Sequence, residues 1–451
     1  MKHLFLLAAC LILYANTSSA QQKQTSGGPY NFSLADCINY AYEHQDSVKN
    51  AQLDLKNSDY TIKALIGQGL PQINGSASFQ DYLQIPVTLI PGEFFNQPGT
   101  FVPLKFGVKY QSSVGASLDQ KIFDPTYLIS LKNRGIYTEL FTKSLTRTKI
   151  QTNVSVTKAY YQVLVSNEQI KLLDANISQL KQQLDQTTQQ NKQGFVEKID
   201  VDRLSVSYNN LLTNRENVVR SLVLNYELLK FQMGMPIKQD LVLVDKLEDI
   251  KFNNIDEAGI SSTDTAFYTN RIEYSLMQTN EHLNQIDLKR KKAQFLPSLS
   301  FFGSISSVYQ DNTFSKLYSA NFPTSYIGLK LSMPLFTGLQ HVYQIKQARI
   351  ALQKAQNDLD NVKNAINLQA SVAYTTYMNG IQSLNNQKRN QELAREVLRV
   401  SKIKYQQGVG SSLEVTQAQT ALETADNQYI QALYDALVSK VDLDKAYGKI
   451  N

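Results

Sequence analysis

The chain contains an internal duplication, and this duplication limits the folds that it can adopt. Three pairs of stretches correspond: "TKAYYQVL" at 157–164 with "SVAYTTYM" at 371–378, "KQGFVEKIDV" at 192–201 with "QQGVGSSLEV" at 406–415, and Gly234 with Gly448. The three pairs share an offset of about 214 residues, which is too long for the unit of a solenoid. We therefore expect two copies of one structural half.

Each half is predicted to follow the same order: helix, strand, strand, very long helix, tight turn, helix. The predicted boundaries are a first repeat at 21–236, an inter-repeat segment at 237–262 and a second repeat at 263–451. A Leu-Pro pair ends the opening helix of each half, at 70–71 and 296–297, because proline cannot continue a helix. Strands are expected at about 72–83, 106–122, 298–310 and 325–336.

The long helices are the dominant signal, and they are predicted at about 127–193 and 340–407. At 1.5 Å per residue, each spans roughly 100 Å. In the second, apolar residues recur at spacings of three and four: Ile345, Ala348, Leu352, Ala355, Leu359, Val362 and Ile366. Such a seam packs against a partner helix. The other faces are rich in Gln, Asn, Ser and Thr, which fits both a helix that faces water on its two remaining sides and an ordinary solvated coiled coil.

The predicted strands alternate apolar and polar residues over a length that could cross a membrane. In 106–120, Val114, Ala116 and Leu118 fall on one face, while Ser117 and Asp119 fall on the other. Strands of about 9–11 residues with this alternation are typical of outer-membrane barrels, although half-buried strands of a soluble sheet alternate in the same way. Four strands cannot close a barrel, and an open edge cannot face lipid. A membrane-spanning interpretation therefore requires several chains.

The first twenty residues, 1–20, are predicted to be a cleaved signal peptide, with a basic start, an apolar centre and Ser-Ser-Ala at the end. A competing interpretation takes "LAAC" as a lipoprotein box that ends at Cys10. Cleavage after Ala20 leaves Cys37 as a lone cysteine, so no internal disulfide is expected. The net charge of +6 is mild and spread along the chain, which disfavours nucleic acid as a partner.

The sequence offers little catalytic chemistry. The four histidines are scattered, and none has a second His or Cys at helical ligand spacing, so we expect no metal site and no cofactor. The glycines at 67–69 and 408–410 lack the flanks of a phosphate-binding loop, and no Gly-x-Ser-x-Gly motif is present. An enzyme is therefore not expected.

The chain resembles the TolC family of outer-membrane efflux proteins over nearly all of its predicted mature length. The resemblance rests on the duplicated order of elements, the signal peptide and four stretches: "FSLADCINYAYEHQDSVKNAQLDL", "NEHLNQIDLKRKKAQFLPSLSF", "LSMPLFTG" and "YQQGVGSSLEVTQAQTALETADNQYIQAL". It implies a mainly α fold with membrane β-strands, in which a homotrimer forms a twelve-stranded outer-membrane β-barrel continued by a long periplasmic α-helical barrel. It also implies a passive exit duct that works with a periplasmic adaptor and an inner-membrane pump of the RND or ABC type, which choose the cargo.

The resemblance further implies that the two tight turns lie at the inner end of the tunnel, where the adaptor docks. The adaptor-docking role then falls on Gly194, Phe195, Val196, Gly408, Val409, Gly410 and Ser411. Acidic residues near the family's constriction make Glu197, Asp200 and Glu414 candidates for the periplasmic entrance by location. A structural alternative stands beside this role, because Asp and Glu also favour the first turn of a helix for its dipole.

The turn at 408–414 also has a sufficient local explanation. Gly408 suits the left-handed residue that ends a helix, and Ser411 or Ser412 can cap the helix that follows. A secreted or periplasmic coiled-coil scaffold or chaperone remains the alternative function, in which the strands would form a small soluble sheet.

Overall fold

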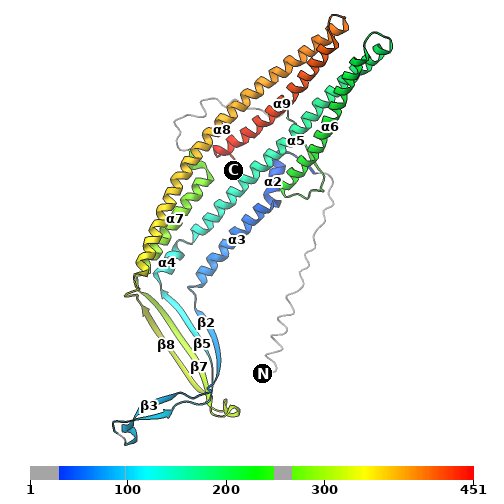
Figure 1. The fold of residues 1–451 in the computed structure, drawn as a ribbon. Helices are drawn as coiled ribbons and strands as arrows, with labels where there is room; N and C mark the ends of the chain where they lie inside the picture. Colours follow the sequence, from blue (N-terminus) through cyan, green and yellow to red (C-terminus); the bar gives the residue numbers. More distant parts are fainter. Residues whose placement is uncertain (1–29, 97, 248–266, 451) are drawn as a thin grey trace.

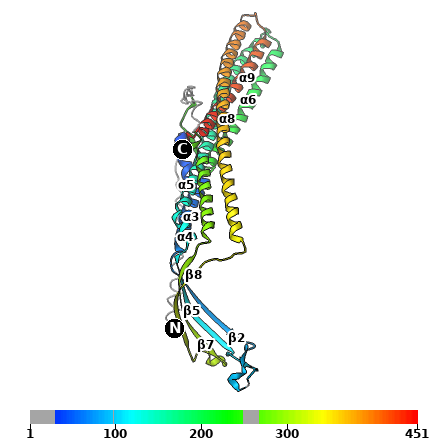
Figure 2. The ribbon, with the colours of Figure 1, turned by 90° about the vertical axis from the view of Figure 1, so that its left-hand side faces the viewer.

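The computed structural model describes residues 30–96, 98–247 and 267–450, and these form one elongated body. Helices form one end of the body and a curved sheet of long strands forms the other end (Figure 1, Figure 2). The predicted signal peptide, Cys10 and the greater part of the inter-repeat segment lie outside the described residues.

The first repeat places its strands between its first helices and its long helix. Its elements are β1 (Tyr30–Phe32), α2 (Leu34–His44), α3 (Asp46–Gly67), β2 (Gln72–Asp81), β3 (Val87–Pro91), η1 (Gly92–Phe95), β4 (Phe101–Lys105), β5 (Tyr110–Phe123), α4 (Pro125–Lys132), α5 (Gly135–Lys192) and α6 (Lys198–Met233). A short strand, β6 (Leu241–Leu243), follows and pairs in parallel with β1.

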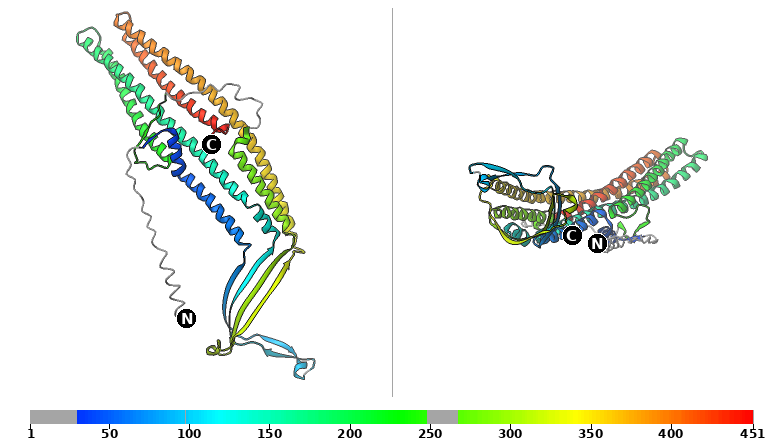
Figure 3. Two further views of the ribbon diagram at one scale, coloured as in Figure 1. Left: turned by 180° about the vertical axis from the view of Figure 1, so that it is seen from behind. Right: turned by 90° about the horizontal axis from the view of Figure 1, so that it is seen from below.

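The second repeat follows the same order with fewer interruptions. Its elements are η4 (Phe267–Asn270), α7 (Ile272–Ala293), β7 (Ser298–Asp311), η5 (Phe314–Lys316), β8 (Phe322–Ser332), α8 (Gln340–Gln406) and α9 (Ser412–Ala446). The 67 residues of α8 and the 58 of α5 correspond to about 100 Å and about 87 Å of helix. Each long helix packs against shorter ones: α5 against α3, α6 and α9, and α8 against α7 and α9 (Figure 3).

The four long strands form an antiparallel sheet in the order β2-β5-β7-β8. One face carries rows of mostly polar residues across the paired strands: Gln80–Gln111–Gln310, Ser76–Gly115–Ser306–Thr324 and Asn74–Ser117–Ser304–Tyr326. The other face carries more apolar rows: Ile73–Leu118–Gly303–Ile327 and Gly75–Ala116–Ile305–Ser325. The alternation seen in the sequence thus separates two chemically different faces.

The apolar seam predicted on α8 is confirmed as the less exposed side of its first half. Ala348 and Ile366 are buried, and none of the other five seam residues is fully exposed. In this part of the molecule α8 packs along α7. The predicted seam therefore marks the face that meets the partner helix.

The helices of the first repeat are more broken than predicted. Instead of one helix at 127–193, α4 ends at Lys132 and α5 begins at Gly135, because the Asn133 side chain donates from Nδ2 to the Ile129 carbonyl at 2.8 Å and closes α4. The helix predicted from residue 33 to 67 is also divided, since Gln45 has an extended backbone with ψ of 127°.

The strand boundaries differ from the prediction as well. The strand expected from residue 106 begins at Tyr110, and Gly107 precedes it with a φ of 131°. Between β2 and β5 the chain forms an additional hairpin from β3 and β4. This hairpin projects beyond the end of the four long strands (Figure 1).

The largest apolar core lies near the middle of the molecule, where α2, α5 and α6 meet the β1–β6 pair. Cys37, Val156, Tyr160, Leu229 and Met233 are fully or almost fully buried there. Burial raises the pKa of the Cys37 thiol to about 12, which keeps it protonated and inert at neutral pH.

Candidate functional site

The two helical hairpins, α5–α6 and α8–α9, end in turns that share one hydrogen-bond pattern. Gly194 has a φ of 81° and Gly408 a φ of 76°. In both turns the N–H of the next residue donates to the carbonyl oxygen five residues earlier, at 3.0 Å. A left-handed glycine with this bond is a common end for a helix. The repeated "QG" therefore encodes the same turn twice.

The third position of the turns differs between the two tips. At the first tip, Asn191 donates from Nδ2 to the Val196 carbonyl at 2.8 Å. At the second, the Gly410 N–H donates to the Lys404 carbonyl at 3.2 Å, and a Cβ at position 410 would lie only 2.9 Å from the Cβ of Lys404. The second tip is consequently too tight for a larger residue at this position.

The caps of the outgoing helices also differ. Ser411 is the N-cap of α9, and its hydroxyl accepts from the Glu414 N–H at 3.2 Å. Glu197 holds the equivalent position before α6 and makes no side-chain capping bond. Of the two serines that could have capped α9, Ser411 does so.

Both tips present an apolar side chain to the outside. Phe195 is 78% exposed and Val409 is 77% exposed, at equivalent positions of the two repeats. Neither side chain contributes to the apolar clusters of its own hairpin among the described residues. The chain thus carries two uncovered apolar residues at one end of the molecule.

Of the three acidic candidates, one contacts the opposite hairpin. The Ser412 hydroxyl donates a hydrogen bond to Oδ1 of Asp200, and the Asp200 carboxylate also lies 3.7 Å from the guanidinium of Arg203. Glu197 and Glu414 are exposed. Asp200 is therefore the acidic candidate that links the two hairpins, whereas Glu197 and Glu414 are exposed.

Two further residues near the second tip are held away from water. The Tyr405 hydroxyl is buried and makes no hydrogen bond within the described part of the chain. Burial raises the pKa of Tyr405, and the charge of Asp200 adds to this effect. Burial also lowers the pKa of Lys402. The tip end of the hairpin pair thus contains polar groups that are partly shielded from water.

A buried polar cluster on the same hairpins was missed in the sequence. Asp426 is 6% exposed and accepts from Asn176 Nδ2 and from Gln391 Nε2, each at 2.7 Å, with Arg395 at 3.8 Å. These residues come from α5, α8 and α9. A signal existed, because Asp426 interrupts an apolar row four residues after Leu422 and four before Ile430.

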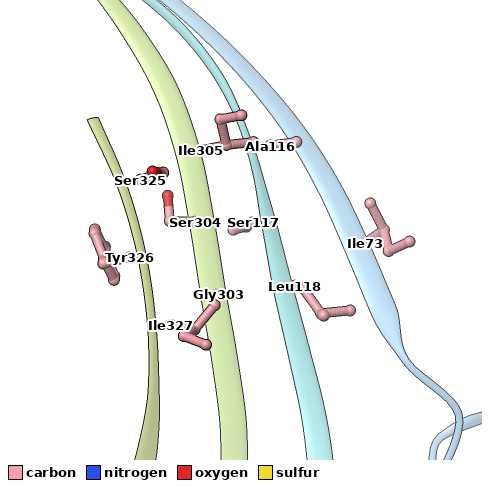
Figure 4. Close-up of a pocket in the computed structure, with 10 residues that line it drawn as sticks. All are labelled: Ile73, Ala116, Ser117, Leu118, Gly303, Ser304, Ile305, Ser325, Tyr326 and Ile327. Carbon is pink, nitrogen blue, oxygen red and sulfur yellow. The ribbon is translucent and has the colours of Figure 1, made fainter. Parts of the chain in front are cut away.

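The sheet carries a hollow of about 470 Å³ on its more apolar face (Figure 4). The small residues Ala116 and Gly303 leave this space between the larger Leu118, Ile305 and Ile327. It holds no cluster of charged groups, since its lining is apolar residues, serines and one tyrosine. The hollow is a feature of a surface for apolar contact rather than a reaction site.

The described helices provide no membrane span, and the described His, Cys, Asp and Glu side chains provide no metal site. Across residues 30–96, 98–247 and 267–450, no helix combines the length and apolar character needed to cross a membrane. Within the same ranges, no group of three or more His, Cys, Asp or Glu side chains is placed to hold a metal ion.

The chain is similar to known proteins both in sequence and in fold. A family model described as "Outer membrane efflux protein" matches residues 276–449, which lie in the second repeat. The chain is 24% identical to the outer membrane protein TolC of Salmonella enteritidis, over 76% of this chain and 70% of that protein. It is 23% identical to the alkaline protease secretion protein AprF of Pseudomonas aeruginosa, over 73% of this chain and 68% of that protein.

The fold likeness extends further than the family model. A solved structure of CusC matches with a TM-score of 0.75 and 15% identity, and the match covers 93% of both chains. Both repeats, with their strands and their long helices, therefore share one architecture with CusC.

Proposed function

We propose that this chain, which is a TolC-like outer-membrane efflux protein, assembles as a homotrimer whose barrel and helical tunnel form a passive duct out of the cell. In this proposal the sheet lies in the outer membrane and the helices extend into the periplasm. The chain acts as a channel and not as an enzyme.

The open edges of the sheet carry the proposal. Among the described residues, β2 pairs only with β5 and β8 pairs only with β7, so both outer strands have free backbone groups. Such groups cannot remain unpaired in lipid. Pairing β8 of one copy with β2 of the next satisfies both edges, and three copies give twelve strands, which lies within the range of known barrels.

The two faces of the sheet and the long helices support the same assignment. A barrel in lipid needs apolar residues outside and tolerates a polar interior. The rows of Gln, Ser and Asn suit a water-filled lumen, and the rows with Ile305 and Ile327 suit contact with lipid. The helices then continue the lumen by roughly 100 Å.

The proposal is tested by reconstituting the purified full-length protein in planar lipid bilayers and measuring ion conductance. We expect a heat-modifiable trimer that needs detergent for solubility and conducts ions in the bilayer. A monomer that stays soluble without detergent and carries no current would instead support the scaffold or chaperone alternative.

We also propose that the tips dock the hairpins of a periplasmic adaptor, which connects the duct to an inner-membrane pump of the RND or ABC type. The exposed Phe195 and Val409 support this role, because uncovered apolar residues at equivalent positions mark an interaction surface. Gly194, Val196, Gly408, Gly410 and Ser411 would hold these side chains in place through the two turns.

Docking is tested with Phe195→Asp and Val409→Asp, which add a charge to each tip. We expect loss of export and loss of adaptor capture while the trimer still forms. Thr420→Asp, at an exposed position of α9 away from the tip, is the matched control and keeps both activities. Export that survives in a variant with both Phe195→Asp and Val409→Asp would exclude the tips as the docking site.

The entrance of the duct is proposed to be closed by the contact between Asp200 and Ser412. This contact joins the two hairpins at the end where cargo would enter. Asp200→Asn and Ser412→Ala should raise the conductance of the reconstituted channel. Glu197→Gln and Glu414→Gln should leave it unchanged if these exposed residues serve only their own helix ends, and an increase there would assign them to the entrance.

A further inference from the structure

Positive charge is concentrated where the helices meet the long strands. Four junction segments, 61–71, 120–134, 287–297 and 333–349, contain the helix ends and their links to the four-stranded sheet. Together they hold ten Lys and Arg and two Asp, a net charge of +8, whereas the whole chain carries +6. All other residues of the chain therefore sum to a slightly negative charge.

The other end of the same strands carries no such excess. The connections there, residues 81–109 and 311–321, contain three acidic and three basic residues. This end of the sheet lies away from the helices (Figure 1). The excess of cations is thus confined to the end of the sheet that faces the helices.

The densest part of the junction segments is the run Lys289–Lys292 at the end of α7. Within it, Arg290 forms an ion pair with Asp287 at 2.6 Å. Lys289 and Lys292 are exposed and take part in no ion pair among the described residues. Residues three apart lie on the same side of a helix, so these two ammonium groups can act together on one anionic surface.

The helix dipole accounts for only some of these cations. Basic residues in the last turn of a helix interact favourably with its dipole, which covers Lys292 in α7 and Lys132 in α4. Lys63 precedes the last turn of α3, and Lys346 lies near the start of α8. The concentration of charge at this level of the molecule therefore needs a second explanation.

Exposed apolar side chains accompany the cations in the junction segments. Leu335 is 90% exposed and Phe336 is 82% exposed, and Phe123 and Leu296 are also exposed. Aromatic and apolar residues beside lysines are typical of a membrane–water interface, because the apolar groups enter the lipid while the ammonium groups reach the headgroups. The junction segments combine both kinds of residue.

We propose that the junction segments bind the anionic headgroups of glycerophospholipids in the leaflet next to the helices, with Lys289 and Lys292 as the main contacts. This inference rests on the proposed function, which places the sheet in the membrane. A cation close to an anionic lipid surface contributes roughly fivefold to the affinity, so the two lysines together contribute roughly 30-fold at low salt. Added salt weakens this contribution.

The test measures which phospholipid lies beside α7. The full-length protein is reconstituted at low salt in phosphatidylcholine vesicles that contain a trace of photoactivatable phosphatidylglycerol or phosphatidylcholine, and crosslinks to residues 287–297 are quantified by mass spectrometry. We expect phosphatidylglycerol to crosslink more than phosphatidylcholine in the wild type. A variant with Lys289→Gln and Lys292→Gln should lower this ratio several-fold, up to about 30-fold.

A matched control removes two exposed cations elsewhere. Lys388→Gln with Arg389→Gln lies about 70 Å along α8 from its start, and it should keep the wild-type ratio. Excess glycerol 3-phosphate in solution should also leave the ratio unchanged. If it abolishes the phosphatidylglycerol crosslink, the cations bind soluble phosphate and the lipid contact is overturned.

Equal crosslinking of the two lipids in the wild type, or an unchanged ratio in the Lys289 and Lys292 variant, overturns the inference. Ion conductance in phosphatidylcholine bilayers is measured in parallel and separates this failure from that of the proposed function. Current without a lipid preference leaves the proposed function standing. Absence of current in the wild type overturns the proposed function and the lipid contact with it.

Discussion

Arg271 offers the most quantitative test of how the second repeat is held together. Its guanidinium is 5% exposed, and it donates to the Glu273 carboxylate at 3.0 Å and to the Ala446 carbonyl at 3.0 Å. It thus ties the start of α7 to the end of α9. We predict that Arg271→Met destabilises the protein because it leaves Glu273 without its cation.

The size of the effect follows from burial. Breaking a buried ion pair by removing one partner costs about 3–5 kcal/mol, and the lower end applies because the Glu273 side chain is 31% exposed. With an unfolding entropy of about 2.1 cal/mol/K per residue over roughly 400 residues, a loss of about 3 kcal/mol lowers Tm by about 3–4 °C.

The pKa of Glu273 determines how the loss of stability in Arg271→Met changes with pH. Burial raises the pKa of Glu273, but the hydrogen bond and charge of Arg271 outweigh it and hold the pKa below its ordinary value of 4.5. Glu273 therefore stabilises the wild type above pH 4.5, and this contribution is lost as the pH falls through the folded pKa. In Arg271→Met, burial is opposed only by a backbone hydrogen bond and the charge of Lys445, so the pKa of Glu273 rises and the penalty shrinks as the pH falls toward it.

The assay is the apparent Tm of the detergent-solubilised protein, followed by circular dichroism at pH 7.5 and pH 5. The difference between wild type and Arg271→Met should be larger at pH 7.5. Adding Glu273→Gln to the variant should recover part of the loss at pH 7.5, because the uncompensated charge is then absent. Equal Tm values for wild type and Arg271→Met at both pH values would refute the reasoning.

Three further predictions concern single positions. Gly408→Ala should cost about 1–2 kcal/mol, because a left-handed backbone is unfavourable for Ala and nothing surrounds the added Cβ, whereas Gly234→Ala should lower Tm further, since its Cβ would lie 2.6 Å from a backbone carbonyl oxygen. Ile305→Arg should reduce membrane assembly by about 2–4 kcal/mol at the lipid face, while the neighbouring Ser306→Arg should assemble normally, as gel migration of the trimer would show. Cys37 should resist maleimide labelling at pH 8 until the protein unfolds, and rapid labelling of the folded trimer would contradict its burial.

The order of elements was predictable from the sequence because both repeats follow it and strong local signals mark its elements. The left-handed glycines at 194 and 408 and the alternation in β5 and β8 each depend on neighbouring residues alone. The break at Asn133 was not predicted, since an Asn within a long helical pattern closes the helix only where its side chain turns back to the preceding turn.

The contacts between hairpins could not be predicted in the same way. Asp426 interrupts an apolar row, but its partners carry no such signal: Gln391 looks like an ordinary solvated position of a long helix, and only the packing of α5 against α9 brings Asn176 to Asp426. Nothing in the sequence favoured one of the three acidic candidates of the tips over the others. The hydrogen bond between Asp200 and Ser412 distinguishes Asp200 from the other two. Such pairings lie 35 to 250 residues apart in the chain, so local patterns carry little information on them.

The number of strands in each repeat has a consequence for how such a chain could arise. Each repeat contributes two strands to the four-stranded sheet, which is an even number, so every repeat enters and leaves this sheet on the same side. Copying the unit in a gene therefore adds another pair of strands without sending any helix to the opposite side. The same parity makes β2 and β8 run in opposite directions, so a ring of any number of copies closes with antiparallel neighbours throughout. A unit with three strands would instead have sent the helix that follows it to the opposite side of the sheet.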